Sequence, residues 1–259
     1  KELLTLFYKN HSFFRAIVNI KTEFDSTDES CSIVFSIEEG KRSSIDSIEY
    51  KGLENISAEL LEEVFVEPLI SKGAPYEPPK AQSEIGRILD ILVEHGYPRA
   101  SFDKESSGAF HRASTNNFQL TIVFVPGQRY NFGDVSVQVE PPRDDITPEL
   151  IIRHLDFEQG ELYSKKKTIS SERSLNRLDL FESVRIDHPR FSDTLTSTLI
   201  PTDIFVRPRD RHEISPELSV SDENNTFNLG LGLGYTNRNF LGDARLFTIR
   251  ARVRAQSLL

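Results

Sequence analysis

Alternating apolar and polar residues predict a strand at two corresponding places in the chain. Ile48 and Tyr50 alternate with polar residues in the first place, and Val135, Val137 and Val139 do so in the second. Because successive side chains of a strand point to opposite faces, each stretch presents one apolar face to a core.

A short helix is predicted after each of these strands. Ser57 and Thr147 suit the N-cap position, and Pro148 suits the first helical position, where its missing N–H does no harm. A second helix follows in the first stretch and is expected to end at Gly96, with Pro98 just beyond. Its apolar face consists of residues at helical spacing, namely Ala81, Ile85, Ile88, Leu89 and Leu92.

Two strands are expected to close the first stretch. One lies around residues 99–102, and the other spans residues 118–125, where β-branched and aromatic residues are frequent. The order strand, helix, helix, strand, strand predicts an α+β fold in which two helices cover one face of a small sheet. Leu89 on the helix and Phe124 on the sheet are expected to be buried in the same core.

Two glycine motifs indicate that this unit occurs twice. The segment Gly40-Lys-Arg-Ser-Ser-Ile45 matches Gly127-Gln-Arg-Tyr-Asn-Phe132, and the segment Gly73-Ala-Pro-Tyr76 matches Gly160-Glu-Leu-Tyr163. Both matches have the same spacing, since 127 − 40 and 160 − 73 both equal 87. Matches in the same order at one spacing predict tandem domains.

A third, partial copy opens the chain. His11-Ser-Phe13-Phe-Arg15-Ala16 resembles His95-Gly-Tyr97-Pro-Arg99-Ala100. The first residues are therefore expected to be the end of one more domain of the same kind. The predicted divisions are 1–39 (the C-terminal part of a domain), 40–126 and 127–207 (two complete domains) and 208–259 (a linker and a hairpin).

Beyond residue 207 the pattern changes. Large apolar residues alternate with Asn or Gly over residues 227–235, and after a turn at 237–242 they alternate with Thr and Arg over 247–254. Strands of about ten residues with one apolar face are typical of a lipid-spanning barrel, although an amphipathic hairpin of a soluble sheet has the same pattern. In the barrel interpretation the membrane-facing residues are Phe227, Leu229, Leu231, Leu233 and Tyr235.

Candidate chemistry is sparse. The glycine run at 230–234 lies inside a strand pattern, whereas a nucleotide fingerprint needs a strand before the glycines and a helix after them. Asp144 and Asp145 follow two prolines and are expected to serve a turn or a helix start. The six histidines have no metal-ligand spacing, so we expect no enzyme, no metal and no cofactor.

Composition narrows the interpretation further. With 31 basic and 40 acidic residues the net charge is −9, which is poorly suited to phosphate neutralisation, so no nucleic-acid partner is expected. No apolar stretch approaches the roughly 18 residues of a transmembrane helix. The chain lacks Met and begins at Lys1, so we expect a processed or cut fragment. The single Cys31 opens an alternating segment and is expected to be a small buried apolar side chain.

The repeated unit resembles the POTRA domains of the outer-membrane protein assembly family that includes BamA and TamA. The resemblance is carried by the glycines ahead of the first strands, the two Gly-x-x-Tyr segments and the His95 to Ala100 segment. The turn Asn237-Arg-Asn-Phe240-Leu-Gly242 is similar to the turn of the first barrel hairpin in that family, in which the last POTRA domain runs directly into a membrane barrel.

The resemblance implies a non-enzymatic region of an assembly factor in the bacterial outer membrane, with residues 1–207 in the periplasm. Its implied partners are unfolded outer-membrane protein substrates, periplasmic or lipoprotein subunits, and outer-membrane lipid through the C-terminal barrel. Two alternatives stay open, namely a two-partner secretion transporter and a soluble interaction module made of tandem repeats.

Strand addition is the predicted mode of binding. If the third strand of each unit pairs between the first and the second, the second strand becomes an edge whose N–H and C=O groups an extended peptide could join. The alternative is an edge that is only solvated. The predicted partner-binding residues are Arg99, Ala100, Ser101 and Phe102 in one domain and Val184, Arg185 and Ile186 in the other.

Overall fold

The computed structural model describes residues 1–25, 30–188, 197–223 and 226–258, with side chains left out at a few strand ends. The chain forms two compact units, Lys1–Arg129 and Tyr130–Leu259. Residues 1–39 belong to the same unit as the domain that follows them.

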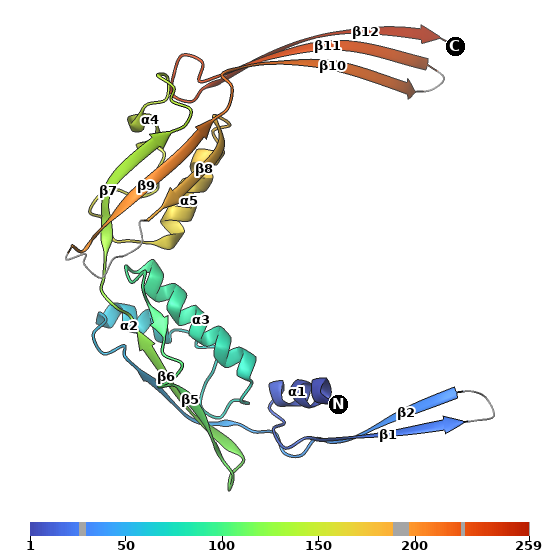
Figure 1. Ribbon diagram of the computed structural model, residues 1–259, viewed down its shortest axis with the longest axis vertical. Coiled ribbons are helices and arrows are strands. Elements are labelled where there is room, and N and C mark those ends of the chain that lie inside the picture. The colour runs from blue at the N-terminus through green and yellow to red at the C-terminus, as the bar shows by residue number, and fades with distance from the viewer. Residues whose placement is uncertain (26–29, 189–196, 224–225, 259) are drawn as a thin grey trace. The chain divides into compact units, whose positions relative to one another are not determined.

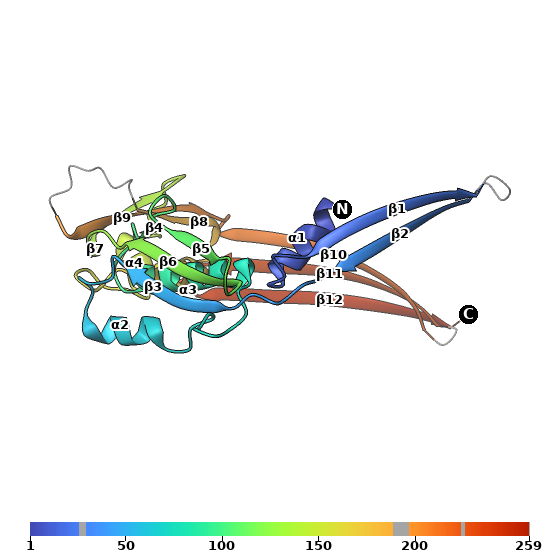
Figure 2. The same cartoon turned by 90° about the horizontal axis from the view of Figure 1, so that it is seen from below.

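The first unit begins with helix α1 (Glu2–Asn10) and the antiparallel strands β1 (Ile17–Asp25) and β2 (Ser30–Glu38). Among the described strands these two pair only with each other, and they run out beyond α1 (Figures 1 and 2). Cys31 is exposed, so the prediction that it is buried is wrong. Phe24 and Ile33 are 79% and 56% exposed, because no described second layer covers this hairpin.

The rest of the first unit follows the expected order. It consists of β3 (Ile45–Lys51), α2 (Ala58–Phe65), α3 (Pro78–Glu94), β4 (Ser101–Phe102), β5 (Gly108–Arg112) and β6 (Asn117–Val125). β6 lies between β3, which is parallel to it, and β4, which is antiparallel. β5 also pairs with β6, so the predicted second strand is divided into two short ones.

Local sequence signals explain the helix ends. The Ser57 side chain accepts a hydrogen bond from the N–H of Leu60 and caps α2, as predicted. α3 ends at Glu94 and Gly96 follows with φ +92°, which confirms the predicted end of this helix. Phe124 is buried as expected, whereas Leu89 is only partly buried against the same core.

The second unit repeats the pattern. It contains β7 (Asn131–Val139), α4 (Pro148–Ile152), α5 (Lys165–Asn176), β8 (Phe181–Asp187) and β9 (Leu199–Pro208), with β9 between β7 and β8. Thr147 caps α4 and Pro148 is at its first position, as predicted. The α4 and α5 side of the sheet holds a core that includes Ile151, Leu175 and Ile204.

The Gly-x-x-Tyr motif has the same structural role in both units. The glycine has φ +84° at Gly73 and φ +85° at Gly160, a conformation that favours glycine. Each glycine N–H bonds the first strand, Gly73 to the Ile45 carbonyl and Gly160 to the Phe132 carbonyl, both at 2.7 Å. The motif therefore fixes the connection between the helices to the beginning of the first strand, which explains why it recurs.

Each unit also has a buried side chain that accepts a hydrogen bond from the backbone N–H 15 residues before it. In the first unit it is Glu84, which is 0% exposed and accepts from the N–H of Leu69 at 3.1 Å. In the second unit it is Ser171, also 0% exposed, which accepts from the N–H of Asp156 at 2.8 Å. Only Glu84 is charged, and Arg87 neutralises it at 2.7 Å.

A separate three-stranded sheet completes the second unit. It consists of β10 (His212–Glu223), β11 (Thr226–Arg238) and β12 (Leu246–Leu258), all antiparallel, with β11 in the centre. β11 and β12 coincide with the predicted hairpin. β10 was not predicted, because Pro216 interrupts the alternation of Ile214, Leu218 and Val220. As an edge strand, β10 tolerates that proline.

Candidate functional site

The first predicted edge is short. Arg99 and Ala100 precede β4, and only Ser101 and Phe102 form ladder pairs with β6. After β4, the loop at residues 103–107 continues along β6. The N–H of Asp103 bonds the Val123 carbonyl at 2.9 Å, and the Ser107 hydroxyl accepts from the N–H of Val123 at 2.8 Å. The strand edge here is therefore two residues long and then broken.

The second predicted edge is longer, and its pairing with β9 is regular from Ser183 to Asp187, after a register shift between Phe181 and Ser183. β8 has seven residues and, among the described strands, pairs only with β9. Val184 and Ile186 turn their side chains into the core, at 7% and 8% exposure. Arg185 lies between them on the opposite face and is exposed. α5 runs beside β8 (Figure 1). The structure thus places the three predicted residues on a strand with one edge that no other described strand joins.

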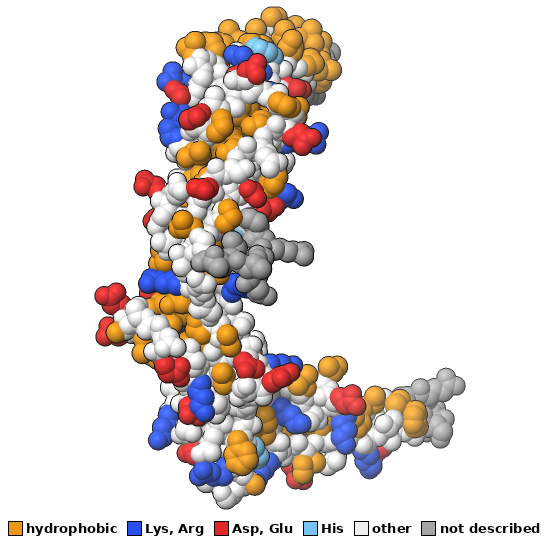
Figure 3. Space-filling model, turned by 60° about the vertical axis from the view of Figure 1, so that its left-hand side comes forward, with side chains coloured by type: hydrophobic (Ala, Val, Ile, Leu, Met, Phe, Trp, Pro, Cys, Tyr) orange, Lys and Arg blue, Asp and Glu red, His pale blue; other side chains and the backbone are white. Residues whose placement is uncertain are grey.

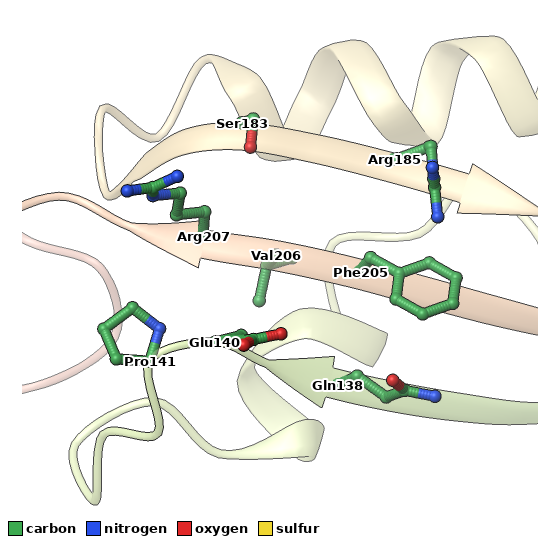
Figure 4. Close-up of a pocket in the computed structure, with 8 residues that line it drawn as sticks. All are labelled: Gln138, Glu140, Pro141, Ser183, Arg185, Phe205, Val206 and Arg207. Carbon is green, nitrogen blue, oxygen red and sulfur yellow. The ribbon is translucent and has the colours of Figure 1, made fainter.

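The face of this sheet opposite α4 and α5 forms a groove next to that edge. Gln138 from β7, Phe205 from β9 and Arg185 from β8 lie in a row across it (Figure 4). The Arg185 guanidinium lies 4.7 Å from the centre of the Phe205 ring, a cation–π contact, and pairs with Asp187 at 3.0 Å. The groove is lined by Gln138, Glu140, Pro141, Ser183, Arg185, Phe205, Val206 and Arg207.

Sequence reasoning missed this groove, although a signal for it was present. Five of its residues occupy strand positions that alternate with the core positions, namely Gln138, Ser183, Arg185, Phe205 and Arg207. The groove combines an apolar ring with side chains of both charges.

The three-stranded sheet places most of the predicted membrane-facing residues on one face. Leu231 lies between Leu218 and Val253 in the ladder, and the three are 62%, 71% and 75% exposed. Leu229 and Leu233 are exposed and Tyr235 is half-buried. Phe227 belongs to β11, but its side chain is outside the described part of the structure. Hydrophobic side chains gather over this part of the chain in Figure 3.

The opposite face of the same sheet is polar and depends on glycine. Gly232 lies between Glu217 and Arg252 in the ladder, and the Glu217 carboxylate reaches over it to Arg252 at 2.5 Å. A Cβ at Gly232 would lie 3.2 Å from Glu217. The glycine run therefore makes room for cross-strand contacts inside a strand, as the period-two pattern indicated.

No catalytic arrangement emerges from the described residues. Within them, no group of three or more His, Cys, Asp or Glu side chains could hold a metal ion. None of the described helices is long and apolar enough to cross a membrane. Asp145, expected at a turn or helix start, lies before α4, where hydrogen bonds from Arg143 hold the pKa of its carboxyl below the usual range.

No protein-family model and no curated protein matches the sequence. Among solved structures, the chain is similar to BamA from Haemophilus ducreyi lacking POTRA domains 1–3, with a TM-score of 0.62 and 17% identity over 82% of this chain and 37% of that one. It is also similar to POTRA domains 3–5 of BamA from Haemophilus influenzae, with a TM-score of 0.50 and 15% identity over 78% and 76% of the two chains. The expected POTRA fold is thereby confirmed, and the chain spans about a third of the length of the first relative.

Proposed function

We propose that this chain is a periplasmic substrate- and partner-binding region of an outer-membrane protein assembly factor, and that it binds extended segments by strand addition. The observation that carries the proposal is the outer edge of β8, a strand of seven residues that among the described strands pairs only with β9 and lies beside a groove with an apolar ring. Main-chain hydrogen bonds from such an edge give affinity with little dependence on sequence. That tolerance suits a receiver of many different unfolded barrel proteins.

Within this proposal β8 is the main site. Its Val184 and Ile186 side chains belong to the core, so an added strand would leave them in place and join the backbone edge. Arg185 and the groove would then contact every second side chain of the bound segment. The β4 edge, with Ser101 and Phe102 as its only strand residues, offers a shorter ladder and serves as a secondary contact.

The domain arrangement follows from the same interpretation. Residues 40–126 and 127–207 are two POTRA-like domains in the periplasm, where lipoprotein or other subunits are further partners. Residues 1–39 are the end of another domain of this kind, since α1, β1 and β2 follow the order of α3 and the two closing strands. Residues 208–259 are the linker and the first strands of an outer-membrane barrel, supported by the apolar face of β10–β12.

A binding measurement tests the main site. The full chain in detergent micelles is titrated with a labelled ten-residue peptide whose apolar residues occupy alternate positions, and with a peptide of the same composition whose apolar residues are clustered. We expect only the first to bind. Arg185→Pro, which breaks the β8–β9 ladder opposite Phe205 and so bends the β8 edge, should weaken its binding tenfold or more.

Lys165→Pro is the matched control. This residue is exposed at the first position of α5, where proline is tolerated, so its variant should bind as the unmodified chain does. Equal affinities for Arg185→Pro and Lys165→Pro, with both variants folded by circular dichroism, would place peptide binding away from β8. Equal binding of the two peptides would contradict strand addition altogether.

A further inference from the structure

The turn between β11 and β12 is bound to the preceding domain by residues distant in sequence. Asn239 is 3% exposed, and its Nδ2 donates to the backbone carbonyl of Asp145 at 2.6 Å and to the Asp145 carboxylate at 3.2 Å. Its Oδ1 accepts from the N–H of Ala244 at 2.9 Å. One carboxamide therefore both closes the turn and ties it to the loop before α4.

Ion pairs flank this carboxamide. Arg238 is 8% exposed and pairs with Glu213 at 2.6 Å and with Asp179, just before β8, at 3.4 Å. On the other side, Asp243 pairs with Arg153 at the end of α4 at 2.8 Å. The turn thus contacts the domain at three separate places. The buried carboxamide of Asn239 is the main contact, because isolated exposed ion pairs contribute little to stability.

The backbone of the turn is strained. Asn239, Leu241, Asp243 and Ala244 have φ of +64°, +56°, +59° and +56°. Asn and Asp tolerate this left-handed conformation, but Leu and Ala adopt it only where their surroundings hold them in it. The contacts to Asp145 and Arg153 are the surroundings that hold this turn.

The covalent connection alone would leave the sheet free to swing. β9 ends at Pro208 and β10 begins at His212, so a single segment of three residues joins the domain to the three-stranded sheet. A single short connection lets the sheet rotate relative to the domain, whereas two separate connections fix the orientation of the sheet. The turn at residues 238–245 supplies the second attachment.

We propose that residues 238–245 form a latch that sets the orientation of the β10–β12 sheet on the domain at 130–208. The latch goes beyond the proposed binding function, because it determines where the β8 edge and its groove face relative to the strands that follow. Asn239 and Asp243 are its positioning residues. Opening the latch would release the stored backbone strain and allow the domain to swing about residues 210 and 211, since the N–H of Arg209 is bound to the Leu180 carbonyl at 2.9 Å.

Distance measurements between spin labels test the latch in the full chain in detergent micelles. The exposed Cys31 is first replaced by Ser, and cysteines for labelling replace Ser136 on β7 and Ala251 on β12. We expect one narrow distance distribution in this background. Asn239→Ala should widen the distribution at least twofold, since it removes the buried contact to Asp145, and Arg153→Asp should also widen it at least twofold, since it sets a second carboxylate against Asp243.

Charge exchange separates a specific latch from general damage. Adding Asp243→Arg to Arg153→Asp restores an ion pair with reversed polarity, and we expect the narrow distribution to return. Lys51→Asp, which breaks the exposed Glu49 pair in the first unit, is the matched control and should change nothing. An unchanged distribution in Asn239→Ala, or a double variant as wide as Arg153→Asp alone, would overturn the proposal. Neither readout depends on peptide binding, so failure of the latch and failure of the binding function are distinguishable.

Discussion

Replacing Glu84 by Ala should destabilise the first unit by about 3 kcal/mol, whereas the corresponding Ser171→Ala should cost the second unit only about 1–2 kcal/mol. The two side chains have the same backbone task, which is to accept from the N–H of Leu69 or of Asp156. They differ in charge. Comparing the two variants therefore separates the stability that a buried acceptor contributes from the stability that a buried ion pair contributes.

The magnitude follows from the contacts that are lost. Leaving a buried N–H without an acceptor costs about 1–3 kcal/mol, and this part applies at both sites. Removing one partner of a buried ion pair costs about 3–5 kcal/mol. The Arg87 side chain is 22% exposed and also donates to the Val64 carbonyl at 2.6 Å, so part of its charge is still solvated after the change. We therefore expect the lower end of that range.

Hydrogen exchange measures each unit separately in the full chain. The slowest amides of β6 report unfolding of the first unit, and those of β9 report unfolding of the second. Glu84→Gln keeps an oxygen for the Leu69 N–H but removes the charge, so it should fall between Glu84→Ala and the unmodified chain. A loss below about 1 kcal/mol for Glu84→Ala, or equal losses at the two sites, would refute the reasoning.

Tyr50 provides a second readout of the same charge. Burial and, after it, repulsion by the negative Glu84 raise the pKa of Tyr50 to about 12. Removing the charge with Glu84→Gln should lower this pKa, because the repulsion by Glu84 disappears while Arg87, which lowers the pKa, stays in place. Ultraviolet absorbance of the ionised phenol follows the titration, and a pKa that does not move would show that burial alone sets it.

Three further predictions concern other parts of the chain. Gly52→Ala should lower the free energy of unfolding by more than about 2 kcal/mol in denaturant titration, since φ is +82° and the new Cβ would lie 1.8 Å from the Phe124 carbonyl. Gly73→Ala, where the new Cβ meets open space, should lower it by only about 1–2 kcal/mol. Burial lowers the pKa of His188, so the second unit should have its full stability above pH 6.5 and lose stability as the pH falls below that value. His188→Asn should remove this pH dependence when unfolding is measured at a series of pH values. On the proposal that residues 208–259 begin an outer-membrane barrel, Leu231→Arg should weaken insertion of that barrel into liposomes by roughly 2–4 kcal/mol, and unchanged insertion would place Leu231 away from lipid.

The sequence was most informative where a local requirement has to recur. Gly73 and Gly160 repeat because the same left-handed turn bonds the first strand in both units. Helix ends were also predictable, since Ser57, Thr147 and Gly96 act within their own turns. These features depend on neighbours in the chain, so a pattern at fixed spacing reveals them.

Features that depend on distant partners were not predictable. Cys31 has the alternation of a buried strand, but its exposure depends on whether another layer covers the hairpin. β4 has only two residues, too few for any periodicity. The contact between Asn239 and Asp145 joins residues 94 positions apart, and the turn motif that includes Asn239 gave no sign of the partner.

Hydrogen exchange along β8 tests the central claim most directly. The full chain in micelles is incubated in deuterated solvent with and without the alternating peptide, and amide exchange is followed at residues 181–187. Strand addition predicts that every second amide of this strand becomes protected, because in a ladder alternate residues turn their N–H toward the added strand. Unchanged exchange along β8 at saturating peptide, or protection confined to another part of the chain, would contradict the account.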